Sequence, residues 1–194
     1  MNIERENLDS DIKETQRTGR VVWITGLSGA GKSVLAEALT TRLRITDDKV
    51  LLLDGDDLRE VFDASFSHDD NYVRDKRMVL AMQYARLCNV LAKQGFTVVI
   101  ATISLFKEVQ TWNRLNLRGY FEVYLKVPIK ELRRRDEKGL YRGFDAGEIR
   151  NVAGLDLPID EPEFADLVFE FSPNRTVNKA VDELLNRLNR DKHL

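Results

Sequence analysis

Short apolar runs alternate along the chain with longer segments in which apolar residues recur every three or four positions. The first run is continuously apolar, as in a strand buried on both faces of a sheet, and the longer segments have the period of amphipathic helices. We expect strands at residues 21–25, 50–53, 97–101, 121–125 and 167–171, and helices at residues 32–44, 73–93, 105–116, 129–136 and 177–188. This alternation predicts an α/β fold, a parallel sheet flanked by helices on both faces.

The helical spacing also predicts which side of a helix is buried. For the first helix these residues are Leu35, Ala38, Leu39 and Leu43. For the long helix they are Val79, Met82, Ala85, Leu87, Val90 and Leu91. Residues 62–72, just before the long helix, show no such spacing and are expected to form a loop with a short turn.

Composition places limits on the class of protein. Residues 1–19 are polar and predict a solvated arm, and residues 20–194 are expected to form one domain. The net charge of −2, with both signs interspersed, argues against nucleic acid polymers or anionic membranes as partners. No apolar run could span a membrane or serve as a signal peptide, so we expect a cytoplasmic protein. Cys88 is the only cysteine, which excludes an intramolecular disulfide and predicts a packing role.

The strongest chemical signal lies between the first strand and the first helix. Gly26-Leu27-Ser28-Gly29-Ala30-Gly31-Lys32-Ser33 fits G-x-x-x-x-G-K-[ST], the phosphate loop of P-loop NTPases. Glycines let backbone N–H groups close around phosphate oxygens, and the helix N-terminus adds partial positive charge. We expect Lys32 to reach the outer phosphates and the Ser33 hydroxyl to ligate Mg²⁺. A tight turn without a ligand is the alternative, but it would not require the Lys-Ser pair.

Two carboxylates follow the second strand. Asp54 and Asp56 lie where open α/β sheets bind ligands, at the carboxyl end of a strand. A carboxylate there can accept the proton of an incoming hydroxyl or hold Mg²⁺ through water, and two carboxylates can divide these roles. The alternative is a solvated turn or a helix cap.

The segment 138–162 has the composition of a mobile lid. It combines several glycines and prolines with charged residues between the fourth and fifth predicted strands. A lid that closes over the site would keep water away from the transferred phosphoryl group.

Together these motifs resemble those of the adenylyl-sulfate kinases. The resemblance covers residues 20–188 and rests on the order and spacing of Gly26–Ser33, Leu53-Asp54-Gly55-Asp56-x-x-Arg59, Phe66-Ser67, Ile103-Ser104, Arg135-Asp136-x-Lys138-Gly139-Leu140-Tyr141, Ala146-Gly147-Glu148-Ile149 and Asn151-x-x-Gly154. It implies a P-loop kinase that transfers phosphate from MgATP to the ribose 3′-hydroxyl of adenosine 5′-phosphosulfate, as a homodimer.

The resemblance also implies roles for individual residues. ATP contacts are expected from Gly26, Ser28, Gly29, Ala30, Gly31, Lys32, Ser33 and Val34, and from Arg135 against the base. Catalytic roles are expected for Lys32, for Asp56 as the proton acceptor and for Asp54 as its positioning neighbour, and Mg²⁺ contacts for Ser33 and Asp54. Contacts to the acceptor are expected from Asp56, Arg59, Phe66, Arg74, Ile103, Ser104, Lys138, Leu140 and Val152.

Several acceptor-side residues depart from the family pattern. Asn71 replaces an arginine, and Arg74 replaces an asparagine. Val152 stands where the family has a phenylalanine that stacks on the adenine, a contact worth on the order of 1–3 kcal/mol. Either another ring such as Phe144 takes over the stacking, or the pocket accepts a different nucleotide.

These departures leave the acceptor open. Adenosine 5′-phosphosulfate is the first expectation. The alternative is another nucleotide-linked acceptor such as cytidine diphosphoramidate, the substrate of a relative in capsule-sugar modification. A non-catalytic nucleotide-binding module would fit a chain that had lost Lys32 or Asp56, and both are present. A kinase of a small non-nucleotide metabolite is disfavoured by the motif at residues 138–141.

Overall fold

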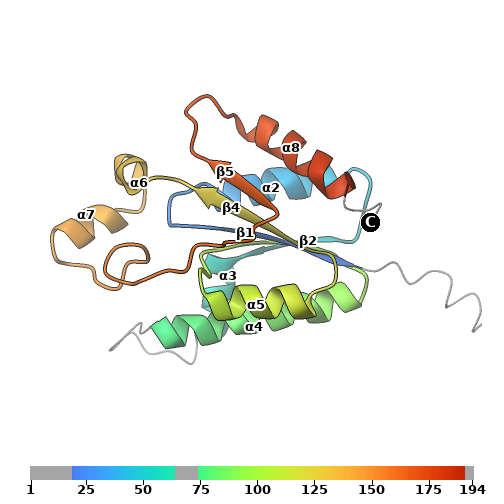
Figure 1. Ribbon diagram of the computed structural model, residues 1–194, viewed down its shortest axis with the longest axis horizontal. Helices are drawn as coiled ribbons and strands as arrows, with labels where there is room; N and C mark the ends of the chain where they lie inside the picture. Colours follow the sequence, from blue (N-terminus) through green and yellow to red (C-terminus); the bar gives the residue numbers. More distant parts are fainter. Residues whose placement is uncertain (1–18, 64–73, 191–194) are drawn as a thin grey trace, which may run out of the picture.

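Five parallel strands form the centre of the computed structural model, which describes residues 19–63 and 74–190 (Figure 1). In chain order the elements are β1 (Arg20–Gly26), α2 (Lys32–Leu43), β2 (Val50–Asp54), α3 (Gly55–Asp63), α4 (Arg74–Lys93), β3 (Thr97–Thr102), α5 (Lys107–Asn116), β4 (Tyr120–Lys126), α6 (Ile129–Arg135), α7 (Leu140–Asp145), β5 (Leu167–Glu170) and α8 (Val177–Arg190). The expected arm at residues 1–19 lies almost entirely outside the described residues.

The strand order is β2-β3-β1-β4-β5, and every pair is parallel. The chain first builds β1, β2 and β3 and then crosses to the other side of β1 for β4 and β5. Such a reversal of strand order creates a crevice at the carboxyl ends of the strands, where α/β folds bind ligands. The α/β class expected from the sequence is confirmed.

Helices cover both faces of the sheet (Figure 1). Helices α2 and α8 pack over one face with the inward side chains of β1, β3 and β4, whereas α3, α4 and α5 pack over the other. All six residues of β3 are buried, as expected for a strand covered on both faces. Trp23 on β1 is 1% exposed and belongs to the α4 side, and the thiol of Cys88 on α4 is buried in the same cluster.

The expected buried side of α4 is wrong in part: Ala85 is buried and Met82, Leu87 and Leu91 pack against the core, but the two valines do not. Val79 and Val90 are 49% and 54% exposed. The side chains that face the sheet are Leu80, Ala81, Tyr84, Ala85, Cys88 and Ala92. Small alanines and a cysteine allow the helix to approach the sheet closely, which outweighs the greater hydrophobicity of the valines.

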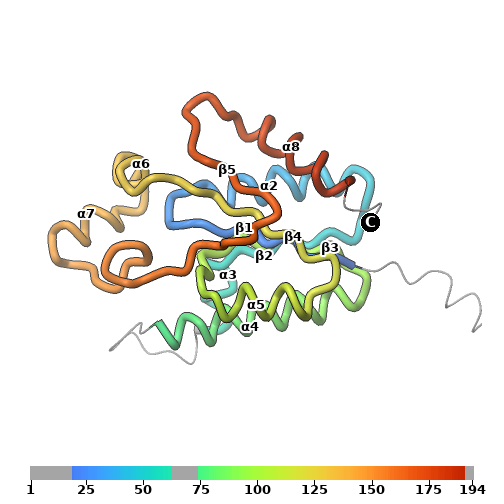
Figure 2. Tube along the Cα trace, viewed as in Figure 1, coloured from blue at the N-terminus to red at the C-terminus, as the bar shows by residue number. Residues whose placement is uncertain are grey.

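Two short helices were not predicted. Helix α3 begins at Gly55 directly after β2, so Asp56 and Asp57 lie in its first turn, where the partial positive charge of the helix N-terminus favours carboxylates. It includes Phe62, which was expected in a loop, and residues 64–73 lie outside the described residues. Helix α7 lies within the expected lid, in the excursion between β4 and β5 that Figure 2 traces. Within the described part of the chain, no helix has the length and apolarity needed to cross a membrane.

Candidate active site

The carboxyl ends of the five strands open into one cavity of about 980 Å³. Residues that follow each strand contribute to its walls, as the reversal in strand order at β1 requires. The expected site residues that line it are Ser28, Gly29, Ala30, Gly31, Lys32, Ser33, Val34, Asp54, Asp56, Arg59, Ile103, Ser104, Arg135, Lys138, Leu140 and Val152. The fold therefore gathers residues that are more than 120 positions apart in the sequence into one site.

The phosphate loop depends on two glycines. Gly26 has a φ of 150°, and a Cβ atom there would lie 2.7 Å from the Leu125 carbonyl oxygen of the neighbouring strand. Gly31 has a φ of 95° at the start of α2, a conformation that side chains disfavour. The loop therefore turns from β1 into α2 with its backbone lining the cavity.

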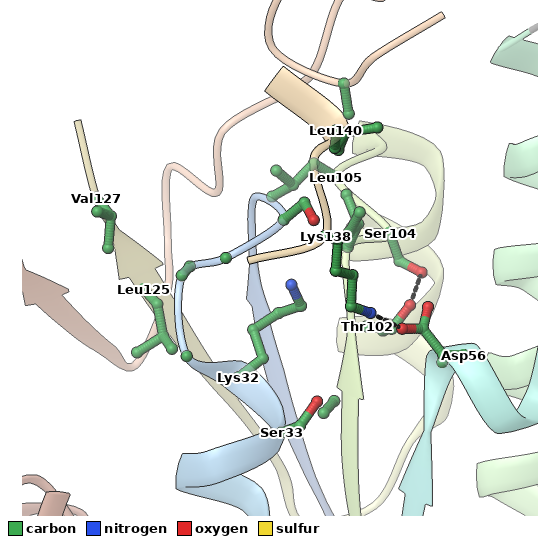
Figure 3. A pocket seen from close by; sticks show the side chains of 18 of the residues that line it. Lys32, Ser33, Asp56, Thr102, Ser104, Leu105, Leu125, Val127, Lys138 and Leu140 are labelled. Carbon is green, nitrogen blue, oxygen red and sulfur yellow. Dashed lines mark hydrogen bonds and ion pairs between the residues drawn. The ribbon is translucent and has the colours of Figure 1, made fainter. Parts of the chain in front are cut away.

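Lys32 extends from the start of α2 into the cavity (Figure 3). Its amino group donates a hydrogen bond to the Leu27 carbonyl, at 2.9 Å. Burial lowers the pKa of Lys32 to about 8, although Asp56 and Asp54 act in the opposite direction. The cavity thus holds a cation whose charge is costly until an anion accompanies it.

Ser33 and Asp54 form a pair of oxygen donors at the end of β2. The Ser33 hydroxyl donates to the Asp54 carboxylate at 2.6 Å, and the other oxygen of Asp54 accepts from the Asp56 amide at 2.8 Å. Hydroxyl and carboxylate oxygens are ligands that Mg²⁺ prefers, and Mg²⁺ at nucleotide sites needs only one or two protein ligands besides phosphates and water. This hydroxyl and carboxylate therefore fit Mg²⁺ that is held largely by a nucleotide.

Asp56 faces two cations. Lys138 Nζ lies 2.5 Å from one carboxylate oxygen (Figure 3). The Arg59 guanidinium lies 3.4 Å from the other oxygen. The hydrogen bond from Lys138 lowers the pKa of Asp56, and the charges of Lys138 and Arg59 act in the same direction. The carboxylate is therefore ionised at neutral pH and can accept a proton.

The end of β3 forms the wall between these groups. Ser104 is 7% exposed and adopts a φ of 28°, which is unusual for a residue other than glycine. Its hydroxyl lies 2.8 Å from that of Thr102 (Figure 3), and the Ile103 carbonyl accepts a hydrogen bond from Thr25 on β1. The bond from Thr25 ties this turn to the end of β1, directly before the phosphate loop.

With this geometry established, comparisons with known proteins identify the family. Residues 18–170 match the sequence model of the adenylylsulphate kinase family. The chain belongs to this family. It is therefore an ATP-dependent kinase, a phosphotransferase, as the sequence predicted.

The relatives of this kinase differ in their acceptors. A cytidine diphosphoramidate kinase from Campylobacter jejuni is 36% identical over 168 residues, which make up 87% of this chain and 95% of the relative. An adenylyl-sulfate kinase from Deinococcus deserti is 38% identical over 176 residues, or 91% and 94% of the two chains. The structure of the Mycobacterium tuberculosis APS kinase in complex with AMPPNP and APS matches with a TM-score of 0.77 and 31% identity, covering 89% of this chain and 98% of that one.

The kinase contains site residues to which sequence reasoning gave no role. Tyr141 on α7 is 2% exposed, and its hydroxyl donates to the Ser28 carbonyl of the phosphate loop at 2.9 Å. Tyr84 on α4 donates to the Gly55 carbonyl at 3.4 Å, next to Asp56. The position of Tyr141 in the lid motif was a signal for the first contact. For Tyr84 only its place on the sheet-facing side of α4 could have indicated the second.

The lid side also supplies a wall for a nucleotide base. The Arg135 guanidinium lies 5.2 Å from the centre of the Phe171 ring and donates to the Gly29 carbonyl at 3.4 Å. Both side chains line the cavity next to the phosphate loop. A flat cation beside a ring offers a surface on which an adenine can stack.

Three residues expected to contact the acceptor or the nucleotide are not among the described residues that line the cavity. Gly26 lies behind the lining of the cavity, where it allows the close approach to Leu125. Phe66 lies outside the described residues. Arg74 does not line the cavity and pairs with the carboxylate of Asp160.

The cavity wall carries no aromatic ring at position 152, and Phe144 does not supply one. Val152 is 4% exposed and lines the cavity, held by an amide hydrogen bond to the Asp156 carboxylate at 2.6 Å. Phe144 is partly buried against the hydrophobic cluster that includes side chains of α2 and α8, and it does not line the cavity. The idea that Phe144 replaces the stacking partner is therefore not supported.

Proposed function

We propose that this kinase transfers the γ-phosphoryl group of MgATP to the ribose 3′-hydroxyl of adenosine 5′-phosphosulfate, giving 3′-phosphoadenosine 5′-phosphosulfate. The observation that carries the proposal is the ionised Asp56 beside Lys138 and Arg59, in the same cavity as the phosphate loop. A base flanked by cations suits a hydroxyl on an anionic acceptor. The adenylyl-sulfate kinases among the relatives support this acceptor.

The reaction follows from the placement of the side chains. Asp56 accepts the proton of the 3′-hydroxyl while the hydroxyl oxygen bonds to the γ-phosphorus and the bond to the bridging oxygen of ADP breaks. Lys32 leaves the Leu27 carbonyl to neutralise the outer phosphates. Ser33 and Asp54 would hold Mg²⁺, directly and through water, and the ion when bound offsets charge on the phosphates.

On the acceptor side, Arg59 contacts the 5′-phosphate group, and Ile103, Ser104 and Leu140 form the surrounding wall. Lys138 comes from the lid, and its side chain is 72% exposed. When the lid closes, its ammonium group can therefore leave the Asp56 carboxylate and pair with the phosphate of an incoming substrate. The pair of Lys138 and Asp56 would then hold the base ionised until the substrates arrive. A homodimer and a cytoplasmic location remain predictions from the sequence.

The role of Asp56 is tested by replacing its carboxylate with an amide of the same shape. We expect Asp56→Asn to lower kcat by about 10²–10⁴-fold, because an amide cannot accept the proton, and to leave MgATP affinity within a few-fold of the parent. Asp57→Asn is the matched control, because Asp57 lies in the same helical turn but does not line the cavity. Turnover by Asp56→Asn at the parent rate would show that another group takes the proton.

A second acceptor, cytidine diphosphoramidate, is favoured by a specific observation. Val152 offers no ring at the buried wall where the family stacks adenine, and a pyrimidine requires less stacking surface. The Campylobacter jejuni relative carries this acceptor in its name. ATP consumption measured in parallel with both acceptors and with none would decide: preference for the cytidine compound would replace the first proposal, and turnover of neither would refute both.

A further inference from the structure

Arg74, at the start of α4, turns away from the cavity towards the segment that precedes β5. Its guanidinium forms a hydrogen-bonded ion pair with the Asp160 carboxylate and lies 3.5 Å from a carboxylate oxygen of Glu108. The same group lies over the Phe106 ring, 5.3 Å from its centre. A planar cation that is stacked and paired in this way is fixed in orientation, which a lysine would not achieve.

Asp160 in turn joins two segments that are distant in the sequence. Its carboxylate accepts from the Lys107 amide at 3.0 Å, and its own amide donates to the Leu105 carbonyl at 3.0 Å. Its carbonyl accepts from the Gln110 side chain at 2.8 Å. Asp160 therefore ties the end of the lid to the loop between β3 and α5 through both its backbone and its side chain.

The residues on either side of these bonds form part of the cavity wall. Leu105, labelled in Figure 3, and Phe106 line it from the β3 side. Leu157, Pro158 and Ile159 line it from the end of the lid. Because Arg74 and Asp160 do not line the cavity themselves, their effect on a ligand must pass through this wall.

We propose that Arg74 is a positioning residue for the acceptor: by holding Asp160, it sets the distance between the end of the lid and the loop after β3. The inference rests on the proposed function, because it assigns this wall to the acceptor rather than to ATP. It also accounts for a departure from the family pattern. Where the family has an asparagine, Arg74 acts as an anchor behind the pocket instead of as a ligand within it.

The test compares Arg74→Ala with the parent under steady-state conditions, using the acceptor that the parent turns over. We expect KM for the acceptor to rise about tenfold, the worth of a charged hydrogen bond, while KM for ATP and kcat stay within twofold. Asp160→Asn keeps an oxygen for the Lys107 amide but removes the charge, so we expect it to reproduce the effect. Arg74→Lys is expected to recover part of the affinity.

The matched control is Lys126→Ala. Lys126 pairs with Glu161 at 3.0 Å, one residue beyond Asp160 on the same segment, and neither lines the cavity. We expect its acceptor KM to equal that of the parent. An unchanged acceptor KM in Arg74→Ala, or an equal rise for ATP, would overturn the inference. A rise in Arg74→Ala without one in Asp160→Asn would also overturn it, because Arg74 would then bind the acceptor directly.

A second readout does not depend on turnover. Amide hydrogen exchange at Lys107 and Asp160 reports the bonds that join the two segments. We expect exchange at both amides to become about tenfold faster in Arg74→Ala but not in Lys126→Ala. Unchanged exchange in Arg74→Ala would refute the anchoring role, whether or not the parent enzyme phosphorylates either acceptor. A parent enzyme that phosphorylates neither acceptor would refute the proposed function, and the exchange experiment would still test the anchoring role.

Discussion

At the scale of single residues, the proton on Lys32 links the site to pH. Its pKa of about 8 reflects burial without a phosphate nearby. A bound triphosphate favours the charged amine and raises this pKa, so the protein takes up protons when MgATP binds at or above pH 8. At pH 8 about half of the Lys32 amines lack a proton, and we expect an uptake of about half a proton per site.

Calorimetric titration of MgATP in buffers of different ionisation enthalpy measures this uptake. The sign follows from the lowered pKa: affinity for MgATP falls as the pH rises through 8, and the uptake becomes small by pH 7. A binding enthalpy at pH 8 that does not depend on the buffer would show that Lys32 is already fully charged in the free protein.

Val152 carries the residue-scale prediction on acceptor choice. Val152→Phe restores a ring at the cavity wall, and stacking on a base is worth about 1–3 kcal/mol. If the wall was shaped for adenine, we expect KM for adenosine 5′-phosphosulfate to fall at least fivefold. Val34→Phe is a control that places a ring on the phosphate-loop side of the same cavity. A rise in this KM would mean that the pocket around Val152 has no room for a ring beside adenine.

At the scale of elements, the lid depends on one buried carboxylate. Asp136 is 8% exposed and accepts from the Tyr141 and Arg142 amides at 3.0 and 2.9 Å, which begins α7. We expect Asp136→Ala to expose these amides and to raise the rate of trypsin cleavage within residues 138–150 about tenfold. Asp145→Asn is the control, because it removes only the exposed pair with Arg133 at the other end of α7. Equal cleavage of both variants would contradict the capping role.

The elements also show what a sequence can predict about this fold. Short apolar runs located all five strands, although β4 and β5 contain the glutamates Glu122 and Glu170 and β5 is buried on one face only. Helix α3 was missed because its nine residues are mostly charged and it begins directly at the end of β2. The buried side of α4 was misjudged because close packing on the sheet, which hydrophobicity alone does not reveal, selects alanine and cysteine.

At the site, the sequence predicted residues that belong to local motifs but not contacts between residues that are distant in the sequence. Lys32, Ser33 and Asp54 belong to local motifs whose spacing fixes their chemistry, and the structure places them together. Arg74 was expected at the acceptor because its neighbours in the sequence form an acceptor motif. The structure pairs it with Asp160, 86 positions away, and no local pattern indicates such a contact.

At the scale of the whole molecule, Cys88 reports on the stability of the fold. It is fully buried between α4 and the sheet, and burial raises the pKa of its thiol to about 12. A thiol reagent can therefore react only after the protein opens, and as the single cysteine it gives a single rate.

MgATP at 100 times its dissociation constant stabilises the folded state by about 2.7 kcal/mol, because it binds only that state. If the opening that exposes Cys88 also dismantles the nucleotide site, labelling by a thiol reagent in MgATP is expected to slow about 100-fold. Labelling in magnesium without ATP is the control. An unchanged rate would mean that α4 opens while the phosphate loop stays intact, and the two faces of the sheet would then be separate units of stability. We expect the labelling to slow because β1 connects the two regions. Its Trp23 packs in the same cluster as α4, and the strand continues directly into the phosphate loop.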